Sequence, residues 1–75
     1  MNRVGEVVRT AQGLAVVRVP DEAYPHIGSE VLDDSLSAVG RVVDVFGPVE
    51  RPYVAVAPDD GVLPATLLGK KLYAR

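Results

Sequence analysis

The chain consists of short valine-rich apolar runs that Gly, Pro or Asp residues interrupt at close intervals. No run repeats its apolar positions every three to four residues, as an amphipathic helix would. This pattern is typical of β-strands. Strands are therefore predicted over residues 4–10, 14–19, 30–32, 39–46, 53–57 and 71–74. The segment 62–68 fits either a short helical turn or extended chain.

The connections between these runs carry turn-forming residues. Gly13 can take the left-handed conformation that short loops need, so the first two strands are predicted to form a hairpin. Asp33 and its neighbours predict a turn in which side chains bond their own backbone. Residues 20–28 contain two prolines and are predicted to be irregular, with a brief turn at 21–24.

Many short strands with Gly and Pro between them favour an all-β fold. We expect a single domain over residues 1–75, formed by a small closed or partly open β-barrel of about six strands. Closure is favoured over an open sheet because it removes strand edges that would otherwise pair with other chains.

The longest apolar run, residues 39–46, alternates imperfectly between apolar and polar positions. Strict alternation places Val43 and Val45 on one face and Asp44 on the other, so that both faces carry apolar groups. Either a partner or the segment 62–68 is then expected to cover the run. Asp44 is expected to accept backbone donors near the following bend, because a buried polar group must find partners.

The segment from Phe46 to Tyr53 combines stiffness with aromatic character. Pro48 and Pro52 fix the backbone and remove two donors, and two of the four aromatic residues flank them. Rigid aromatic groups on a loop are typical of an interaction hot spot. The alternative is an ordinary turn with both rings tucked inward.

The sequence around this bend resembles the signature of a known family. Residues 38–49, AVGRVVDVFGPV, followed by 52–56, PYVAV, resemble the Gar/Naf family, whose members are proteins of H/ACA ribonucleoprotein particles. Residues 27–33 and 69–73 resemble the preceding strand and the closing strand of that family. The similarity thus spans nearly the whole chain.

The resemblance implies a barrel similar to those of translation factors and a non-catalytic accessory subunit. Such a subunit docks on the catalytic domain of the pseudouridine synthase and aids loading and release of substrate RNA in rRNA modification and ribosome biogenesis. Guide RNA and substrate rRNA would be reached indirectly, through the particle. The implied docking surface comprises Val45, Phe46, Pro48, Val49, Pro52 and Tyr53, with Gly47 in a backbone role.

Three other functions stay open beside this one. The chain lacks Gly/Arg-rich tails and so resembles the minimal archaeal form, but an assembly factor of the same family shares the core. A stand-alone RNA-binding module is the second alternative, and a translation-factor-like barrel with a ligand site is a third. A weak homodimer of the isolated chain is compatible with its apolar surface.

The composition of the chain excludes some kinds of site and of cellular environment. The chain has no cysteine, which excludes disulfides and thiolate metal sites, and its formal net charge of −2 argues against a large footprint on RNA. No apolar run approaches the ~20 residues of a membrane span. We therefore expect a protein that stays off membranes, and the resemblance implies the cytoplasm of an archaeal cell or the nucleolus of a eukaryote.

Candidate chemistry is sparse. His26 is the sole histidine and is expected to be a loop residue, so no metal, cofactor or catalytic residue is predicted. A small basic patch near RNA would form if the first and last strands pair; the alternative is ordinary solvated charge. Its members would be Arg3, Lys70, Lys71 and Arg75.

Overall fold

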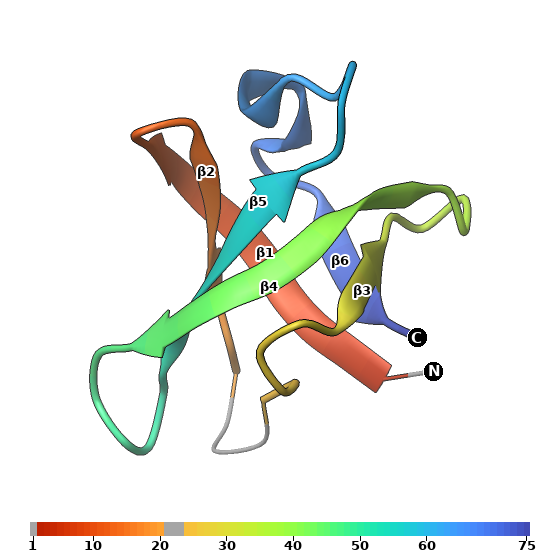
Figure 1. The fold of residues 1–75 in the computed structure, drawn as a ribbon. Helices are drawn as coiled ribbons and strands as arrows, with labels where there is room; N and C mark the ends of the chain where they lie inside the picture. Colours follow the sequence, from red (N-terminus) through yellow and green to blue (C-terminus); the bar gives the residue numbers. More distant parts are fainter. Residues whose placement is uncertain (1, 21–23) are drawn as a thin grey trace.

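Six antiparallel strands close into a barrel in the computed structural model, which describes residues 2–20 and 24–75 (Figure 1). The strands are β1 (Asn2–Ala11), β2 (Leu14–Arg18), β3 (Glu30–Leu32), β4 (Ala38–Phe46), β5 (Tyr53–Pro58) and β6 (Lys71–Ala74). Their order around the barrel is β1-β2-β5-β4-β3-β6, and β6 pairs with β1 to close it. The predicted all-β barrel is confirmed, and every predicted strand end lies within two residues of the observed one.

Valine side chains fill the interior. The inward positions of all six strands contribute to one core cluster, because alternate residues of each strand face the same side. Burial of each such side chain stabilises the fold by roughly 1.5–3 kcal/mol. Its most deeply buried members include Val4, Val7, Val17, Val31, Val42, Val54, Val56 and Leu72.

The ambiguous segment 62–68 forms a short 3-10 helix, η1 (Pro64–Leu67), the blue coil at the top of Figure 1. Proline in the first turn suits a helix start, because its missing N–H would have no partner there. Leu67 is buried in the core cluster, and the main contacts of η1 are with β1 and β2. The segment therefore plugs one end of the barrel and is not the cover expected over the longest strand.

Strand β4 departs from strict alternation because its pairings shift twice. The register with β3 shifts near Val39, and the register with β5 shifts near Val43. A bulge adds one unpaired residue and turns the side chains that follow. Val39 and Val42 are consequently both in the core and Val45 packs against it, while Val43 is exposed. The prediction that Val43 and Val45 share a face was wrong.

Asp44 is also turned outward by the second shift. Its carboxylate accepts a 2.8 Å hydrogen bond from the Val45 N–H, so the expected backbone donor is present. The residue is exposed, so the expectation that Asp44 is buried was wrong. None of the polar or charged residues in the described part of the chain is buried.

The predicted turns agree with the structure where it describes them. Gln12 and Gly13, with φ of 53° and 79°, form the two-residue hairpin turn between β1 and β2. The Asp33 carboxylate accepts hydrogen bonds from the Ser35 and Ser37 N–H groups at 2.9 and 3.0 Å. The turn predicted at 21–24 falls on residues 21–23, which lie outside the described residues.

Candidate docking surface and cationic cleft

Five outward-facing side chains lie at directly paired positions across five neighbouring strands. Opposed residues in an antiparallel pair share a face, with Cβ atoms about 4.5–5.5 Å apart. We call this set the outer row, and it is charged at the β6 end and aromatic at the β4 end. In order from β6 to β4 it comprises Lys71, Glu6, Arg18, Tyr53 and Phe46.

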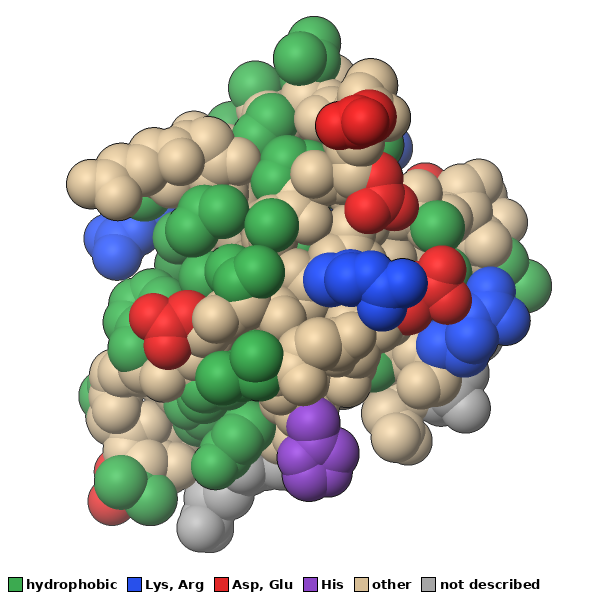
Figure 2. Space-filling model, in the orientation of Figure 1, with side chains coloured by type: hydrophobic (Ala, Val, Ile, Leu, Met, Phe, Trp, Pro, Cys, Tyr) green, Lys and Arg blue, Asp and Glu red, His purple; other side chains and the backbone are tan. Residues whose placement is uncertain are grey.

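The aromatic end of the outer row continues into the loop between β4 and β5. The Phe46 and Tyr53 rings stack with centroids 5.7 Å apart and planes 24° apart. Phe46 is 37% exposed and Val49 is 78% exposed. We call Phe46, Pro48, Val49 and Tyr53 the bend patch; Figure 2 shows hydrophobic side chains gathered over β2, β5 and this end of β4. The bend is presented outward and is not tucked into the core.

Local backbone geometry holds the bend patch in place. Gly47 has φ of +91°, and a Cβ added there would lie 2.9 Å from Cδ2 of Tyr53, so the ring packs directly on the glycine. The Arg51 N–H donates to the Pro48 carbonyl at 3.3 Å, and the Val19 N–H donates to the Pro52 carbonyl at 3.1 Å. A loop fixed in this way loses little entropy when a partner docks.

The predicted docking residues differ in how far they are accessible. Phe46, Gly47, Pro48 and Val49 are exposed, and Val45 and Tyr53 are half-buried. Pro52 is buried, and its carbonyl accepts the hydrogen bond from Val19 that holds the bend. Their contact with a partner stays a prediction.

Sequence reasoning missed two exposed apolar residues at the middle of strand β4 and in the segment bonded to it. Ile27 is 65% exposed and Val43 is 43% exposed. They flank a pair of hydrogen bonds, in which the Gly28 N–H donates to the Val42 carbonyl at 2.8 Å and the Val42 N–H donates to the Ser29 carbonyl at 3.0 Å. The position of the bulge at Val43 decides the exposure of that residue, and apolar patterning carries no signal for it.

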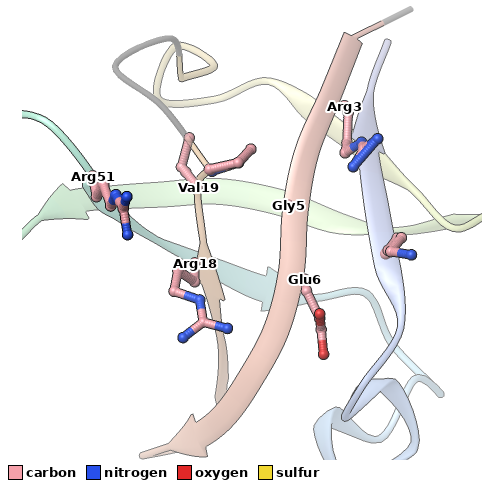
Figure 3. A pocket seen from close by; sticks show the side chains of 8 residues that line it. Arg3, Gly5, Glu6, Arg18, Val19 and Arg51 are labelled. Carbon is pink, nitrogen blue, oxygen red and sulfur yellow. The ribbon is translucent and has the colours of Figure 1, made fainter.

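The charged end of the outer row borders a cleft of about 490 Å³. Its floor is buried backbone and the Val19 side chain, and its rim is mostly cationic. Figure 3 shows Arg18 and Arg51 to one side of β1 and Arg3 to the other, with Gly5 between them. We call this the cationic cleft; its charged residues are Arg3, Glu6, Arg18, Arg51 and Lys71.

Gly5 sets the floor of the cationic cleft by letting β1 and β2 approach closely. A Cβ at Gly5, where φ is +153°, would overlap the carbonyl oxygen of Arg18 and lie 2.9 Å from its carbonyl carbon. Backbone atoms cannot move aside as a flexible side chain can. Any larger residue must therefore separate the two strands.

The predicted basic patch is partly assembled. Strands β1 and β6 do pair, and Arg3 and Lys71 both line the cationic cleft. Lys70 is not in the lining, and the Arg75 Nε donates to a Glu30 carboxylate oxygen at 2.8 Å. Contact of these four residues with RNA stays a prediction. Arg18 and Arg51 were missed, because only the strand register brings them to the same cleft.

Two further findings concern metal binding and membrane helices. His26 is exposed in the loop before β3, and no group of three or more His, Asp or Glu residues suited to a metal ion occurs in residues 2–20 and 24–75. Within the same residues, no helix is long and apolar enough to cross a membrane.

Comparison with known proteins gives a match over the whole sequence. The family model described as "Gar1/Naf1 RNA binding region" matches residues 1–75. The "H/ACA ribonucleoprotein complex subunit GAR1" of Chaetomium globosum is 25% identical over 71 residues, which cover 93% of this chain and 34% of the relative. The protein of the same name from Encephalitozoon cuniculi is 30% identical over 57 residues, covering 76% of this chain and 31% of the relative. The chain thus spans about a third of the length of these two relatives.

Two further matches add a relative from a third organism and a solved structure. An uncharacterised protein of Methanocaldococcus jannaschii is 38% identical over 50 residues, covering 67% of this chain and 58% of that protein. The solved structure titled "Structure of the Gar1 domain of NAf1" superposes with a TM-score of 0.74 at 16% identity, covering 99% of this chain and 85% of that one. At this identity the superposition establishes the barrel fold alone.

Proposed function

The chain belongs to the Gar1/Naf1 family, and we therefore propose that it is a non-catalytic subunit of an H/ACA ribonucleoprotein complex. Two relatives carry the name of such a subunit. The family model matches the whole segment that forms the barrel. The particle carries out RNA-guided pseudouridine formation, and its catalytic residues belong to the synthase.

The bend patch is the surface that docks on the pseudouridine synthase. Phe46 and Val49 are exposed apolar side chains on a loop that glycine, proline and backbone hydrogen bonds hold in one shape. A stacked aromatic pair beside exposed apolar residues is the type of anchor that carries most of the energy of a protein interface. This exposed, rigid bend is the single observation on which the docking proposal depends.

Docking of a rigid barrel near the active site supports loading and release of substrate RNA. The barrel restricts the mobile loop with which the synthase grips its substrate, and steps of this kind often limit turnover. Removal of the subunit is therefore expected to slow multiple turnovers while a single turnover on preloaded RNA is retained.

Complex formation with an archaeal pseudouridine synthase tests the proposal directly. The two proteins are mixed with and without guide RNA and followed by size-exclusion chromatography. A complex that forms without RNA is the expected result, and its absence under both conditions would overturn the proposal.

Two charge-introducing variants locate the surface. Val49→Asp is expected to abolish the complex, because it places a charge in the apolar contact, and its exposed position leaves folding intact. Leu63→Asp is the matched control, since Leu63 is 66% exposed next to η1 and lies outside the bend patch. Equal loss of the complex in both variants would contradict docking through the bend.

A further inference from the structure

We propose that the cationic cleft binds the phosphates of single-stranded RNA directly, and that the Tyr24 ring in an adjoining cleft stacks on a base. The inference does not depend on synthase docking: the residues that carry it are not members of the bend patch, although Arg51 lies in the same loop. It places on named residues of the barrel the RNA binding that the description of the matching family gives without residues.

Positive charge is concentrated in the cationic cleft despite the net charge of −2. Half of the chain's eight Lys and Arg residues line it, against one of the eight Asp and Glu residues that the structure describes. In the part of the chain that the structure describes, the only ion pair joins Arg75 to Glu30, so the rim cations have no carboxylate partner there. A local cluster of this kind attracts phosphate although the protein as a whole is acidic.

The cationic cleft continues into a second cleft of about 490 Å³, and the two share Arg3 and Pro20. Tyr24, which is 54% exposed, lines the second cleft together with Pro25. Single-stranded nucleic acid is bound where a basic groove follows the backbone and an aromatic side chain stacks on a base. The two clefts supply these two elements side by side.

RNA fits this pair of clefts better than an acidic protein segment. An acidic peptide would satisfy the cations, but it supplies no planar base for the exposed ring of Tyr24. The matching family is also described as an RNA binding region, although that description names no residues. The chemistry and the description therefore agree on the same ligand class.

The position of the cleft places RNA next to the protein partner. Arg18 of the cationic cleft lies directly opposite Tyr53 of the bend patch across the β2–β5 pair. An RNA strand held at Arg18 would therefore run along the edge of a partner docked at the bend. The barrel would contact RNA at the border of its protein interface.

Binding of a fluorescently labelled single-stranded RNA of about ten nucleotides to the isolated protein, followed by anisotropy over a series of salt concentrations, tests the inference. With three to four phosphate contacts, the plot of log affinity against log salt is expected to have a slope of about −2 to −3. The double variant Arg18→Gln/Arg51→Gln is expected to bind about tenfold more weakly at low salt, with a slope shallower by about 1.4.

The double variant Arg9→Gln/Lys70→Gln is the matched control, because it removes the same charge from exposed cations outside the lining. Its affinity is expected to stay within about threefold of the original chain. If both double variants weaken RNA binding equally, or if the original chain binds no RNA at low salt, the inference is overturned.

Two single variants separate charge from stacking. Glu6→Gln removes the one carboxylate of the lining and is expected to strengthen binding by about twofold to threefold. Tyr24→Ala is expected to weaken binding by about fivefold without changing the salt slope, whereas Tyr24→Phe keeps it within about twofold. Normal RNA binding by the Arg18/Arg51 variant together with loss of the synthase complex would identify the cleft as a protein contact and overturn the RNA proposal.

Discussion

The bend patch and the cationic cleft adjoin in the outer row, where Tyr53 lies directly opposite Arg18, and they are built from different kinds of side chain. The bend patch is apolar; its two rings stack on each other, and the Tyr53 ring packs on Gly47. The cleft is lined by long charged side chains above a rigid floor at Gly5. Apolar contacts draw their energy from removing water and depend little on salt, whereas contacts with phosphate weaken steeply as salt rises. One face of a small barrel can thus carry two contacts that respond to different conditions.

The glycines of the two regions, Gly5 in the cleft and Gly47 in the bend, contact different kinds of atom. Of all the variants, Gly5→Ala is expected to have the largest effect. The new Cβ meets the Arg18 backbone, which cannot move without separating β1 from β2. The free energy of unfolding is expected to fall by about 3 kcal/mol, measured by urea denaturation.

Gly13→Ala serves as the control for Gly5→Ala. Gly13 also has a positive φ, but nothing lies within 4 Å of its added Cβ. The expected cost is about 1 kcal/mol, from backbone conformation alone. Equal losses for the two variants would show that the close approach of β1 and β2 contributes nothing to stability.

Phe46→Ala tests the bend patch as an anchor and is expected to have the second-largest effect. The complex with the synthase should weaken by about 2 kcal/mol, because an aromatic anchor and its stack on Tyr53 are removed. The variant should remain folded, since Phe46 is already 37% exposed. Isothermal titration gives the affinity and thermal unfolding gives the stability.

Leu68→Ala is the matched control for Phe46→Ala, since Leu68 is 49% exposed near η1 and away from the bend. It is expected to leave the complex unchanged within about 0.5 kcal/mol. A Phe46→Ala variant that unfolds would mean that the ring supports the barrel and is not a docking anchor.

Gly47→Ala is expected to have a smaller effect than Gly5→Ala. Its added Cβ meets the Tyr53 ring, which can rotate away, so most of the cost comes from the φ of +91°. We expect a loss of about 1–2 kcal/mol in the free energy of unfolding. A loss as large as that of Gly5→Ala would show that the Tyr53 ring is fixed as firmly as backbone.

The barrel could be predicted from the sequence because its signals are local. Runs of β-branched residues, a glycine in the first hairpin and the Asp33 turn each depend on neighbouring residues only. The same local signals placed the bend between β4 and β5. They indicated that it was stiff, because Pro48 and Pro52 are visible in the sequence itself.

The cationic cleft could not be predicted as fully, because it depends on register. Arg18 and Lys71 are far apart in the chain and meet only because both lie opposite Glu6. Likewise, the exposure of Val43 and Asp44 follows from a shift in the pairing of β4 with β5. A shift of one residue reverses the face of every later side chain, and hydrophobic pattern alone fixes no such shift.

The smallest effects are expected when each variant is tested in the other region's assay: the arginine variant in the synthase titration and Phe46→Ala in the RNA-binding assay. These two measurements separate the two regions most sharply. Arg18→Gln/Arg51→Gln is expected to change the affinity for the synthase by less than about 0.5 kcal/mol, because charges at the rim of an apolar contact contribute little. Phe46→Ala is expected to change RNA affinity by less than about twofold, since Phe46 lies two strands away from Arg18 in the outer row. Both values come from the titrations already described. If the arginine variant loses the synthase complex as well as RNA, Arg18 and Tyr53 act as one surface, and the separation of an apolar from a cationic contact on this barrel is wrong.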